Sequence, residues 1–371
     1  MPAPLRWLLM LLPFALWGTA MAAMKPLLAG AEPLLLASLR LLPAGLVLLL
    51  AARLLGRRLR VDRADLPWLM LFALVDASLF QGLLARGLEQ TGAGLGSVLI
   101  DSQPLLVALL ARALYGEAIN PVGWLGLLLG LLGIVCLGLP PALLRQWWLE
   151  GPVVAGLQPW SHGEAWMLGA AAAMALGTVL CRAASRHSDP VAVTAWHMLI
   201  GGVPLLFATA LGPARAAGWD PAAVWAALQP AWSAVDWALM AYASLLGSAL
   251  AYGLFFSFAS QGDLTGFTAL TFLTPVFALL CGFVLLQERL QPLQWLGAAL
   301  ALLSVLLINR RASLWQPPPG SPPPASASPQ AAFPEAALPQ PASPEADPLA
   351  AARREAGGFD AAAGRPAPEV P

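Results

Sequence analysis

Four ionisable side chains lie deep inside long apolar stretches of this sequence: Arg40, Asp76, Asp101 and His197. A charged group at the centre of a hydrocarbon layer costs about 3 kcal/mol on insertion scales, so such residues face a cavity or a partner. The planar guanidinium of Arg40 can clamp a carboxylate or a phosphate. Either aspartate, once shielded from water, could take up and release a proton. We therefore expect substrate-binding or proton-binding chemistry at these positions.

Purely structural roles are the alternatives. An ion pair between Arg40 and Asp101 would only pin two helices together, and His197 would be a hydrogen-bonded packing residue. Asp76 lies near the centre of its apolar stretch. That is the depth at which a binding site inside a membrane is expected.

A duplicated pattern identifies the elements that must position these groups. Pro104, Glu117, Pro121, Trp124 and Gly126 recur 171 positions later as Pro275, Glu288, Pro292, Trp295 and Gly297. An upstream block repeats with a displacement of 157, at which Gly45 matches Gly202. Fixed spacing over this length indicates two copies of one structural unit.

The composition places both copies in a membrane. Hydrophobic residues make up 58% of the chain and charged residues 11%, whereas a soluble domain carries about 25% charged residues. A net charge of zero gives no basic footprint for nucleic acid. Ten stretches approach the roughly 20 residues that cross a bilayer: 5–24, 34–53, 66–85, 94–114, 121–139, 165–184, 190–211, 235–258, 265–286 and 292–308.

Arginines orient these spans. Several crowd the loop after the second span, Arg182 and Arg186 follow the sixth, and Arg310 and Arg311 follow the tenth. Positive residues are retained in the cytoplasm, so both termini are predicted to be cytoplasmic. Removal of the first span as a signal peptide would leave an unpaired repeat. Five spans per copy is an odd number, so the second copy must be inverted, as in many transporters with a site near the midplane.

The predicted organisation has four parts. Residues 5–139 form the first repeat and residues 165–309 the second, with five transmembrane helices each. Residues 140–164 form an extracytoplasmic linker between them. Residues 310–371 are rich in proline and alanine, which predicts a disordered cytoplasmic tail. The fold class is an all-α polytopic membrane protein of ten helices in two inverted five-helix repeats.

The repeat also tests whether the fold needs the buried charges. At these displacements Asp76 matches Gly247, and Asp101 matches Phe272. The second copy is thus expected to build the same unit without either aspartate. The fold as such does not require the two carboxyl groups, which favours a functional role for them.

Further polar residues surround the expected cavity. Gln81 and Tyr252 are equivalent under the displacement of 171, and both are predicted to line it, with packing as the alternative for Tyr252. Gln103, which directly precedes a repeated proline, is a third candidate. Pro104 and Pro275 lack a backbone donor, so they are expected to bend their helices and free carbonyl groups near the site.

Glu117 and Glu288 end their spans on opposite faces of the membrane. Each lies close to a helix terminus and to the proline that opens the next helix, which predicts capping or pairing across the short loop. The alternative is a gate whose two members serve opposite sides.

These residues resemble a known family. The duplicated Pro104…Glu117…Trp124-x-Gly126 segment and the early Trp17-Gly18 are similar to the EamA-type permeases of the drug/metabolite transporter superfamily. The resemblance covers about residues 5–309. It implies two inverted five-helix halves around a central cavity for small metabolites. Asp101-Ser102-Gln103 departs from the apolar residues typical of the family at this point.

Enzyme chemistry is not indicated. The sequence has no G-x4-G-K-[ST], H-E-x-x-H or G-x-S-x-G motif in a fitting context. Its three cysteines and three histidines are scattered, so neither a metal site nor a cofactor is predicted. The expected partners are a small-molecule substrate and the lipid bilayer of the bacterial inner membrane, and a homodimer is compatible with the sequence.

We therefore predict a secondary transporter, a permease that moves a small organic metabolite by alternating access, with proton coupling as an option. A multidrug or lipid-linked-solute exporter of the same superfamily is one alternative. A non-transporting membrane scaffold or sensor is the alternative of another class.

Overall fold

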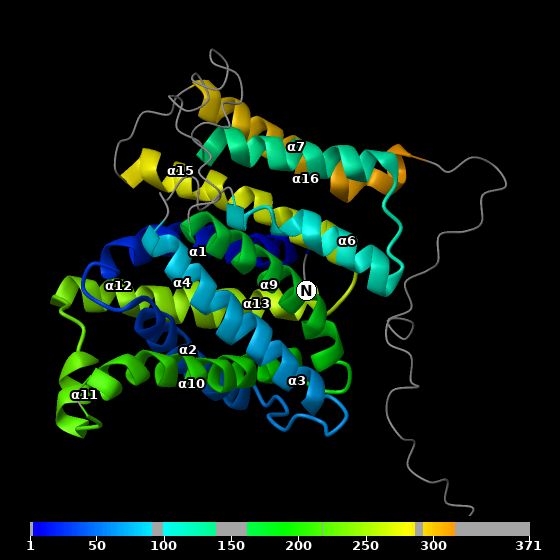
Figure 1. The fold of residues 1–371 in the computed structure, drawn as a ribbon. Helices are drawn as coiled ribbons and strands as arrows, with labels where there is room; N and C mark the ends of the chain where they lie inside the picture. Colours follow the sequence, from blue (N-terminus) through cyan, green and yellow to red (C-terminus); the bar gives the residue numbers. More distant parts are fainter. Residues whose placement is uncertain (1–2, 91–98, 139–161, 217, 286–291, 316–371) are drawn as a thin grey trace, which may run out of the picture. The chain divides into compact units, whose positions relative to one another are not determined.

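The computed structural model describes residues 3–90, 99–138, 162–216, 218–285 and 292–315, and within these ranges the chain is helical with no strand. Figure 1 shows the arrangement of the labelled helices. The elements are α1 (Ala3–Leu27), α2 (Pro33–Leu54), α3 (Leu66–Phe72), η1 (Ala73–Phe80), α4 (Gln81–Gln90), α6 (Gln103–Tyr115), α7 (Pro121–Gly138), α9 (His162–Ala184), α10 (Pro190–Ala216), α11 (Pro221–Ala227), α12 (Ala234–Ser244), η2 (Leu245–Leu250), α13 (Ala251–Ala259), α14 (Leu264–Thr268), η3 (Ala269–Leu273), α15 (Thr274–Leu285) and α16 (Pro292–Leu314).

Ten helical segments occupy the ten predicted spans. Seven are long and apolar enough to cross a membrane, and three shorter apolar helices, Gln103–Tyr115, Pro121–Leu137 and Leu264–Ala278, fill the other positions. The short α11, capped by Asp220, was not expected from the sequence. Most of the predicted linker, the tail beyond residue 315 and Glu288 lie outside the described residues.

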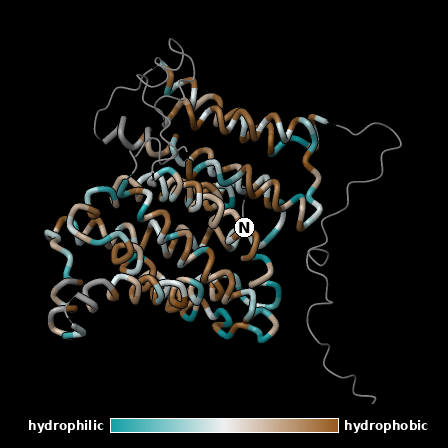
Figure 2. Tube along the Cα trace, viewed as in Figure 1, coloured by the Kyte–Doolittle hydropathy of each residue, from teal (hydrophilic) through white to brown (hydrophobic). Residues whose placement is uncertain are grey.

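Hydrophobic residues (brown) run along the lengths of the helices, and hydrophilic residues (teal) gather near helix ends and turns (Figure 2). Leucines such as Leu46, Leu50 and Leu74 are more than half exposed on the helix surfaces. A protein in water rarely leaves so many large apolar side chains uncovered. Lipid chains would cover them at no such cost, so the helix surfaces fit a bilayer.

The third and eighth spans share an irregularity. Each contains π-helical turns, Ala73–Phe80 in η1 and Leu245–Leu250 in η2, and these segments correspond under the displacement of 171. Such turns are rare and recur at functional sites. The duplicated unit therefore includes a local distortion that composition and spacing did not predict.

Helices α2 and α10 hold equivalent places in the two copies and pack against each other. A Cβ added to Gly45 would lie 2.8 Å from Cγ of Leu199, and one added to Gly202 would lie 2.9 Å from Cδ2 of Leu42. Leu42 matches Leu199 at the displacement of 157, so each contact is the copy of the other. Positions rise along α2 as they fall along α10, so the helices are antiparallel and related by a two-fold axis.

The same relation holds for α7 and α16, the fifth helix of each copy. A Cβ on Gly126 would lie 3.2 Å from the Ser304 carbonyl oxygen, and one on Gly297 would lie 2.8 Å from that of Gly133. Gly126 matches Gly297 and Gly133 matches Ser304. Small residues allow this close backbone approach. Two antiparallel contacts of this kind are what inverted copies of one unit produce.

Candidate functional site

A cavity lies among helices of both copies and holds about 480 Å³ of space between its lining side chains, counting the part open to the surroundings. Its polar lining comes from α1, α2, the turn before α6, α13, η3 and α15: Trp17, Arg40, Asp101, Tyr252, Thr271 and Thr274. The rest of its wall is apolar.

Arg40 is 5% exposed on α2. Its Nη1 donates to Sδ of Met24 over 2.9 Å, and its Nη2 donates to the side-chain carbonyl of Gln81. Its Nε has no hydrogen-bond partner. A thioether and an amide are weak partners for a group that is always charged, and among the described residues no carboxylate lies within ion-pair distance of it.

Asp101 is also 5% exposed and belongs to a turn just before α6 begins at Gln103. The described part of the chain gives its carboxyl group no hydrogen bond and no ion pair. Arg40 and Asp101 face the same cavity, yet the ion pair considered from the sequence is not formed. Burying an unpaired charge is costly, and the described residues supply no ion-pair partner for either group.

Three more polar atoms at this cavity are buried without a partner among the described residues. They are Nε1 of Trp17 and the hydroxyl oxygens of Thr271 and Thr274. A buried polar group without a hydrogen bond costs about 1–3 kcal/mol. Such groups are exceptional in native proteins and need an explanation. Their concentration on one cavity is explained if they bind a ligand.

Gln81 and Tyr252, the equivalent pair of the third and eighth spans, meet directly. Nε2 of Gln81 donates to the Tyr252 hydroxyl over 2.8 Å. The Tyr252 ring lies 4.9 Å from that of Trp17, between ring centroids. Gln81 itself borders a smaller space beside Arg40. This chain of contacts fixes the orientation of the Arg40 guanidinium beside the cavity.

Asp76 and His197 form a second buried group, with exposures of 0% and 1%. Nε2 of His197 lies 3.1 Å from Oδ2 of Asp76, and Nδ1 lies 2.5 Å from the Thr194 carbonyl oxygen. Since a carbonyl only accepts, Nδ1 carries a hydrogen. The imidazole is stacked on Phe72 at 4.2 Å. Neither Asp76 nor His197 lines the cavity.

The remaining predicted residues of the membrane interior lie apart from these two groups. Gln103 is fully buried and its Nε2 donates to the Thr178 hydroxyl over 3.2 Å. Pro104 and Pro275 each occupy the first turn of a helix, α6 and α15, where no donor is needed. The regular α-helix is interrupted just before these prolines, by a turn at residues 101–102 and by the 3-10 helix η3.

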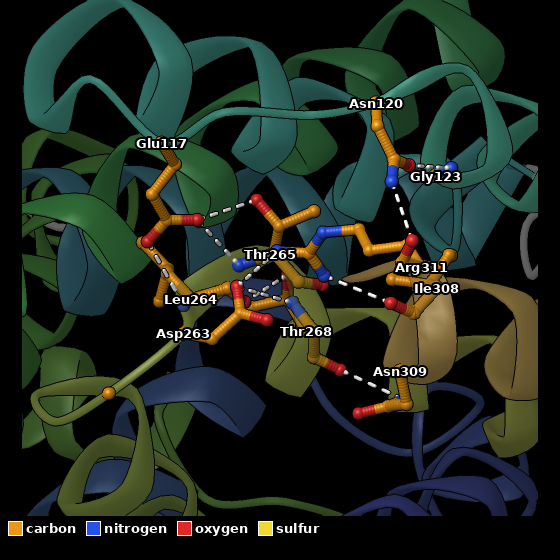
Figure 3. Close-up of polar contacts among 12 residues, drawn as sticks. Glu117, Asn120, Gly123, Asp263, Leu264, Thr265, Thr268, Ile308, Asn309 and Arg311 are labelled. Carbon is orange, nitrogen blue, oxygen red and sulfur yellow. Dashed lines mark hydrogen bonds and ion pairs between the residues drawn. The ribbon is translucent and has the colours of Figure 1, made fainter. Parts of the chain in front are cut away.

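Glu117 lies at one end of the bundle and joins the two copies (Figure 3). Its carboxylate accepts hydrogen bonds from the backbone of Leu264 and Thr265, both at 3.1 Å, and from the Thr265 hydroxyl at 2.7 Å. Arg182 completes the set with an ion pair of 3.3 Å. Glu117 thus caps α14 of the other copy, and not the helix across its own short loop.

A second set of contacts ties the same end together (Figure 3). Nδ2 of Asn120 donates to the Arg311 carbonyl over 2.6 Å, and Arg311 forms an ion pair of 2.9 Å with Asp263. Asp263 in turn caps α14 through the amide of Gly266. Both copies contribute to this closure, because Asn120 precedes α7 and Arg311 belongs to α16.

The sequence did not single out Thr271, Thr274 or the role of Trp17. Two features of the sequence pointed to the threonines. Thr271 and Thr274 lie three positions apart, and Thr274 is the equivalent of the candidate Gln103 under the displacement of 171. Among the described residues, no group of His, Cys, Asp and Glu could hold a metal ion.

Comparisons with known proteins agree with this architecture. The model of the "EamA-like transporter family" matches residues 5–139 and 161–310. A solved crystal structure of another protein superposes with a TM-score of 0.65 at 18% identity, covering 84% of this chain and 99% of that one, which supports the fold alone.

Three curated relatives extend the likeness. An "Uncharacterized transporter" of Synechocystis is 49% identical, with 83% of this chain and 90% of the relative covered. A chloroplastic "WAT1-related protein" of Arabidopsis thaliana is 44% identical over 82% and 69%. A "Probable terminal-alkyne amino-acid exporter" of Streptantibioticus cattleyicolor is 30% identical over 80% and 90%.

Proposed function

This chain belongs to the EamA-like transporter family and is a membrane transporter, and we propose that it moves a small organic metabolite by alternating access around the Arg40 cavity. One observation carries the proposal. Among the described residues, Arg40 and Asp101 form no ion pair and three further polar groups have no hydrogen-bond partner, and all five line one cavity between the copies. A scaffold or sensor gains nothing from this costly arrangement. The relative named as an amino-acid exporter also favours a small organic solute.

The contacts of Glu117 support closure of one end in this conformation. Its carboxylate holds the start of α14, so the copies are joined at the side that carries Arg182 and Arg311. By the arginine distribution this side is the cytoplasmic one, with both termini there and the protein in the bacterial plasma membrane. Breaking these contacts would let the copies separate and expose the cavity from that side.

Proton coupling is assigned to the Asp76–His197 pair. Because Nδ1 of His197 already carries a hydrogen, a single further proton can lie between Nε2 of His197 and Oδ2 of Asp76. The pair is then either a neutral carboxylic acid beside a neutral imidazole or a carboxylate beside an imidazolium. The other carboxyl oxygen of Asp76 has no hydrogen-bond partner in the part of the chain that the structure describes. Arg40 is a further group whose charge acts on Asp76, and the charge of Asp76 acts in turn on Cys181 and Tyr252. Loading this proton changes the charge next to α10 and η1, two elements that must shift if the copies rock.

The proposal is tested by transport assays in proteoliposomes. Uptake and export of a panel of solutes are measured with and without a pH gradient. Wild type is measured beside Asp76→Asn and Asp101→Asn, with the exposed Glu89→Gln as a matched control. We expect one solute class to be driven by the gradient, Asp76→Asn to keep passive exchange without the drive, and Asp101→Asn to lose solute transport. If no solute moves in wild type, the proposed function is wrong. If both variants behave as wild type, the site assignment is wrong.

A further inference from the structure

The end of α2 and the loop that joins it to α3 form a strongly basic surface at one end of the bundle (Figure 1). Its five arginines are all exposed: Arg53, Arg57, Arg58, Arg60 and Arg63. Within the ranges that the structure describes, Arg57 is the member of this set that forms an ion pair, over 2.9 Å to Asp189. The described part of the chain therefore leaves four positive charges of residues 53–65, the arginine loop, without an acid partner.

The backbone of the arginine loop is held in place by the second copy. Nε1 of Trp196 donates to the Leu59 carbonyl oxygen over 2.9 Å, and the amide of Asp62 donates to the Ser188 hydroxyl over 2.9 Å. That hydroxyl donates in turn to the buried Asp65 carboxylate over 2.7 Å. A partner of the exposed arginines would thus meet a loop whose backbone needs little further ordering on binding.

An apolar stripe on α2 leads up to this loop. Leu46, Leu50 and Leu54 are exposed and lie four positions apart along the helix. Residues three and four apart share a face of an α-helix, so Arg53, in the last turn of α2 and three positions after Leu50, continues the same stripe. Since α2 is long and apolar enough to span a membrane, its surface offers an apolar strip that ends in a cation.

The second copy has the stripe without the cation. Val203, Phe207 and Leu211 on α10 match the three leucines at the displacement of 157, and they are exposed as well. The position that matches Arg53 is Ala210. The duplicated helix therefore forms with alanine at this place, and the positive charge is a property of the first copy that the shape of the unit does not require.

Phospholipids join the two chemistries that this surface offers to bind. A guanidinium group matches the oxygens of a phosphate with two parallel hydrogen bonds. Basic clusters directly beside a membrane-spanning helix attract anionic lipid headgroups. A zwitterionic headgroup gains less, because it brings a cation of its own. An acyl chain would cover the leucines of the stripe without the cost of exposing them to water.

We propose that the arginine loop and the leucine stripe of α2 form a binding site for an anionic phospholipid of the adjacent leaflet. The phosphate lies beside Arg53 and the loop arginines, and one acyl chain lies along Leu46 and Leu50. These residues are separate from the lining of the Arg40 cavity, so the site is distinct from the proposed solute site. The proposal depends on neither the solute nor the direction of transport.

Lipid binding to the purified full-length protein in detergent is the test, measured by native mass spectrometry. The probes are phosphatidylglycerol, phosphatidylcholine with the same acyl chains, and sn-glycerol 3-phosphate, which has the phosphate without the chains. One arginine beside an anionic headgroup strengthens binding about 5-fold. With several arginines present, phosphatidylglycerol is expected to bind about 10-fold or more tightly than either other probe, and added ammonium acetate should weaken this preference.

Three double variants locate the site. Arg53→Gln with Arg58→Gln should lower the affinity for phosphatidylglycerol about 25-fold, as two successive 5-fold steps, and leave that for phosphatidylcholine unchanged. Arg53→Lys with Arg58→Lys keeps both charges and should retain the preference. Arg6→Gln with Arg112→Gln removes two exposed arginines outside the loop and should change the affinity by less than about 5-fold.

Thermal melting of each variant checks its folding. If the first double variant does not fold, Arg60→Gln with Arg63→Gln removes two other charges of the loop and takes its place, with the same loss of affinity expected.

Three results would overturn the proposal. Phosphatidylglycerol that binds no more tightly than phosphatidylcholine would mean that the charge selects no lipid. Glycerol 3-phosphate that binds as tightly as phosphatidylglycerol would mean a site for a soluble anion. An equal loss of affinity in the loop variant and in the control outside the loop would mean attraction to the whole surface. Solute transport is not a readout here, so the proposed function is tested separately.

Discussion

The two copies of the repeat place different chemistry at equivalent points. In one, Asp76 lies against Gly177, where an added Cβ would come within 2.5 Å of Oδ1, and it pairs with His197. In the other, Gly247 lies against Ala20, with 2.6 Å from an added Cβ to the alanine Cβ. Ala20 matches Gly177 at the displacement of 157. The same junction is therefore built twice, once with a carboxyl group and once without.

This difference separates two tasks. His197 has its acid partner, and the pair is enclosed away from the cavity. Arg40, the counterpart of His197, forms no ion pair with any described residue and lines the cavity. Duplication supplied one framework, and the loss or gain of a single carboxylate made one copy a candidate proton site and the other a candidate anion site.

Restoring the missing carboxylate should give the largest effect. In the double variant Ala20→Gly with Gly247→Asp, the new acid has the room that Gly177 gives Asp76, and it should pair with Arg40. Solute binding should fall about 100-fold, because a buried internal ion pair replaces the ligand. The double variant Ala20→Gly with Gly247→Asn is the control, because its new side chain has the same size without the charge, and its solute affinity should fall far less. Equal binding by both double variants would contradict the proposed role of Arg40.

Removing the existing carboxylate should have the next largest effect. Asp76→Asn keeps the size of the side chain but prevents the exchange of a proton with His197. Accumulation driven by a pH gradient should fall about 10-fold, while exchange without a gradient remains. The measurement is solute flux in proteoliposomes at several imposed gradients. A variant that retains the full pH response would show that another group carries the proton.

The Glu117 contacts should contribute a smaller effect, on stability and gating. Glu117→Gln loses the ion pair with Arg182 and weakens the bonds to Leu264 and Thr265. Hydrogen bonds to a charge contribute about 1.5–3 kcal/mol, so the melting temperature in detergent should fall by a few degrees. Glu89→Gln, at an exposed site, should change it by less. An unchanged melting temperature together with unchanged transport would remove Glu117 from the account.

The smallest effect is expected at Tyr252. Tyr252→Phe keeps the ring beside Trp17 but loses the hydroxyl that accepts from Gln81. One neutral hydrogen bond contributes about 1 kcal/mol, so KM should rise about 5-fold with little change in maximal rate. A larger change in rate than in KM would mean that Tyr252 acts in the conformational step and not in holding Arg40.

The sequence predicted the architecture well because the evidence for it is local and repeated. The ten spans follow from apolar length, and the family follows from the motif ending in Trp124-x-Gly126 and its copy; both predictions are confirmed. The antiparallel pairing of α7 with α16 follows from an odd number of spans per copy.

Side-chain contacts between distant helices were harder to predict. The depth of Asp76 follows from its place in the third span, but depth does not give the direction of a side chain around its helix, so the pairing of Asp76 with His197 was not predicted. The π-helical turns in η1 and η2 change that direction and leave no sequence pattern. The partner of Glu117 was also missed, because α14 begins 147 positions later in the chain.

The most direct test of the central claim is an experimental structure of the protein with a transported solute bound. The account predicts solute density in the cavity, with an anionic group next to Nε of Arg40 and with the Asp76–His197 pair intact. Density for the solute elsewhere, with Arg40 paired to Asp101 across the cavity, would contradict it.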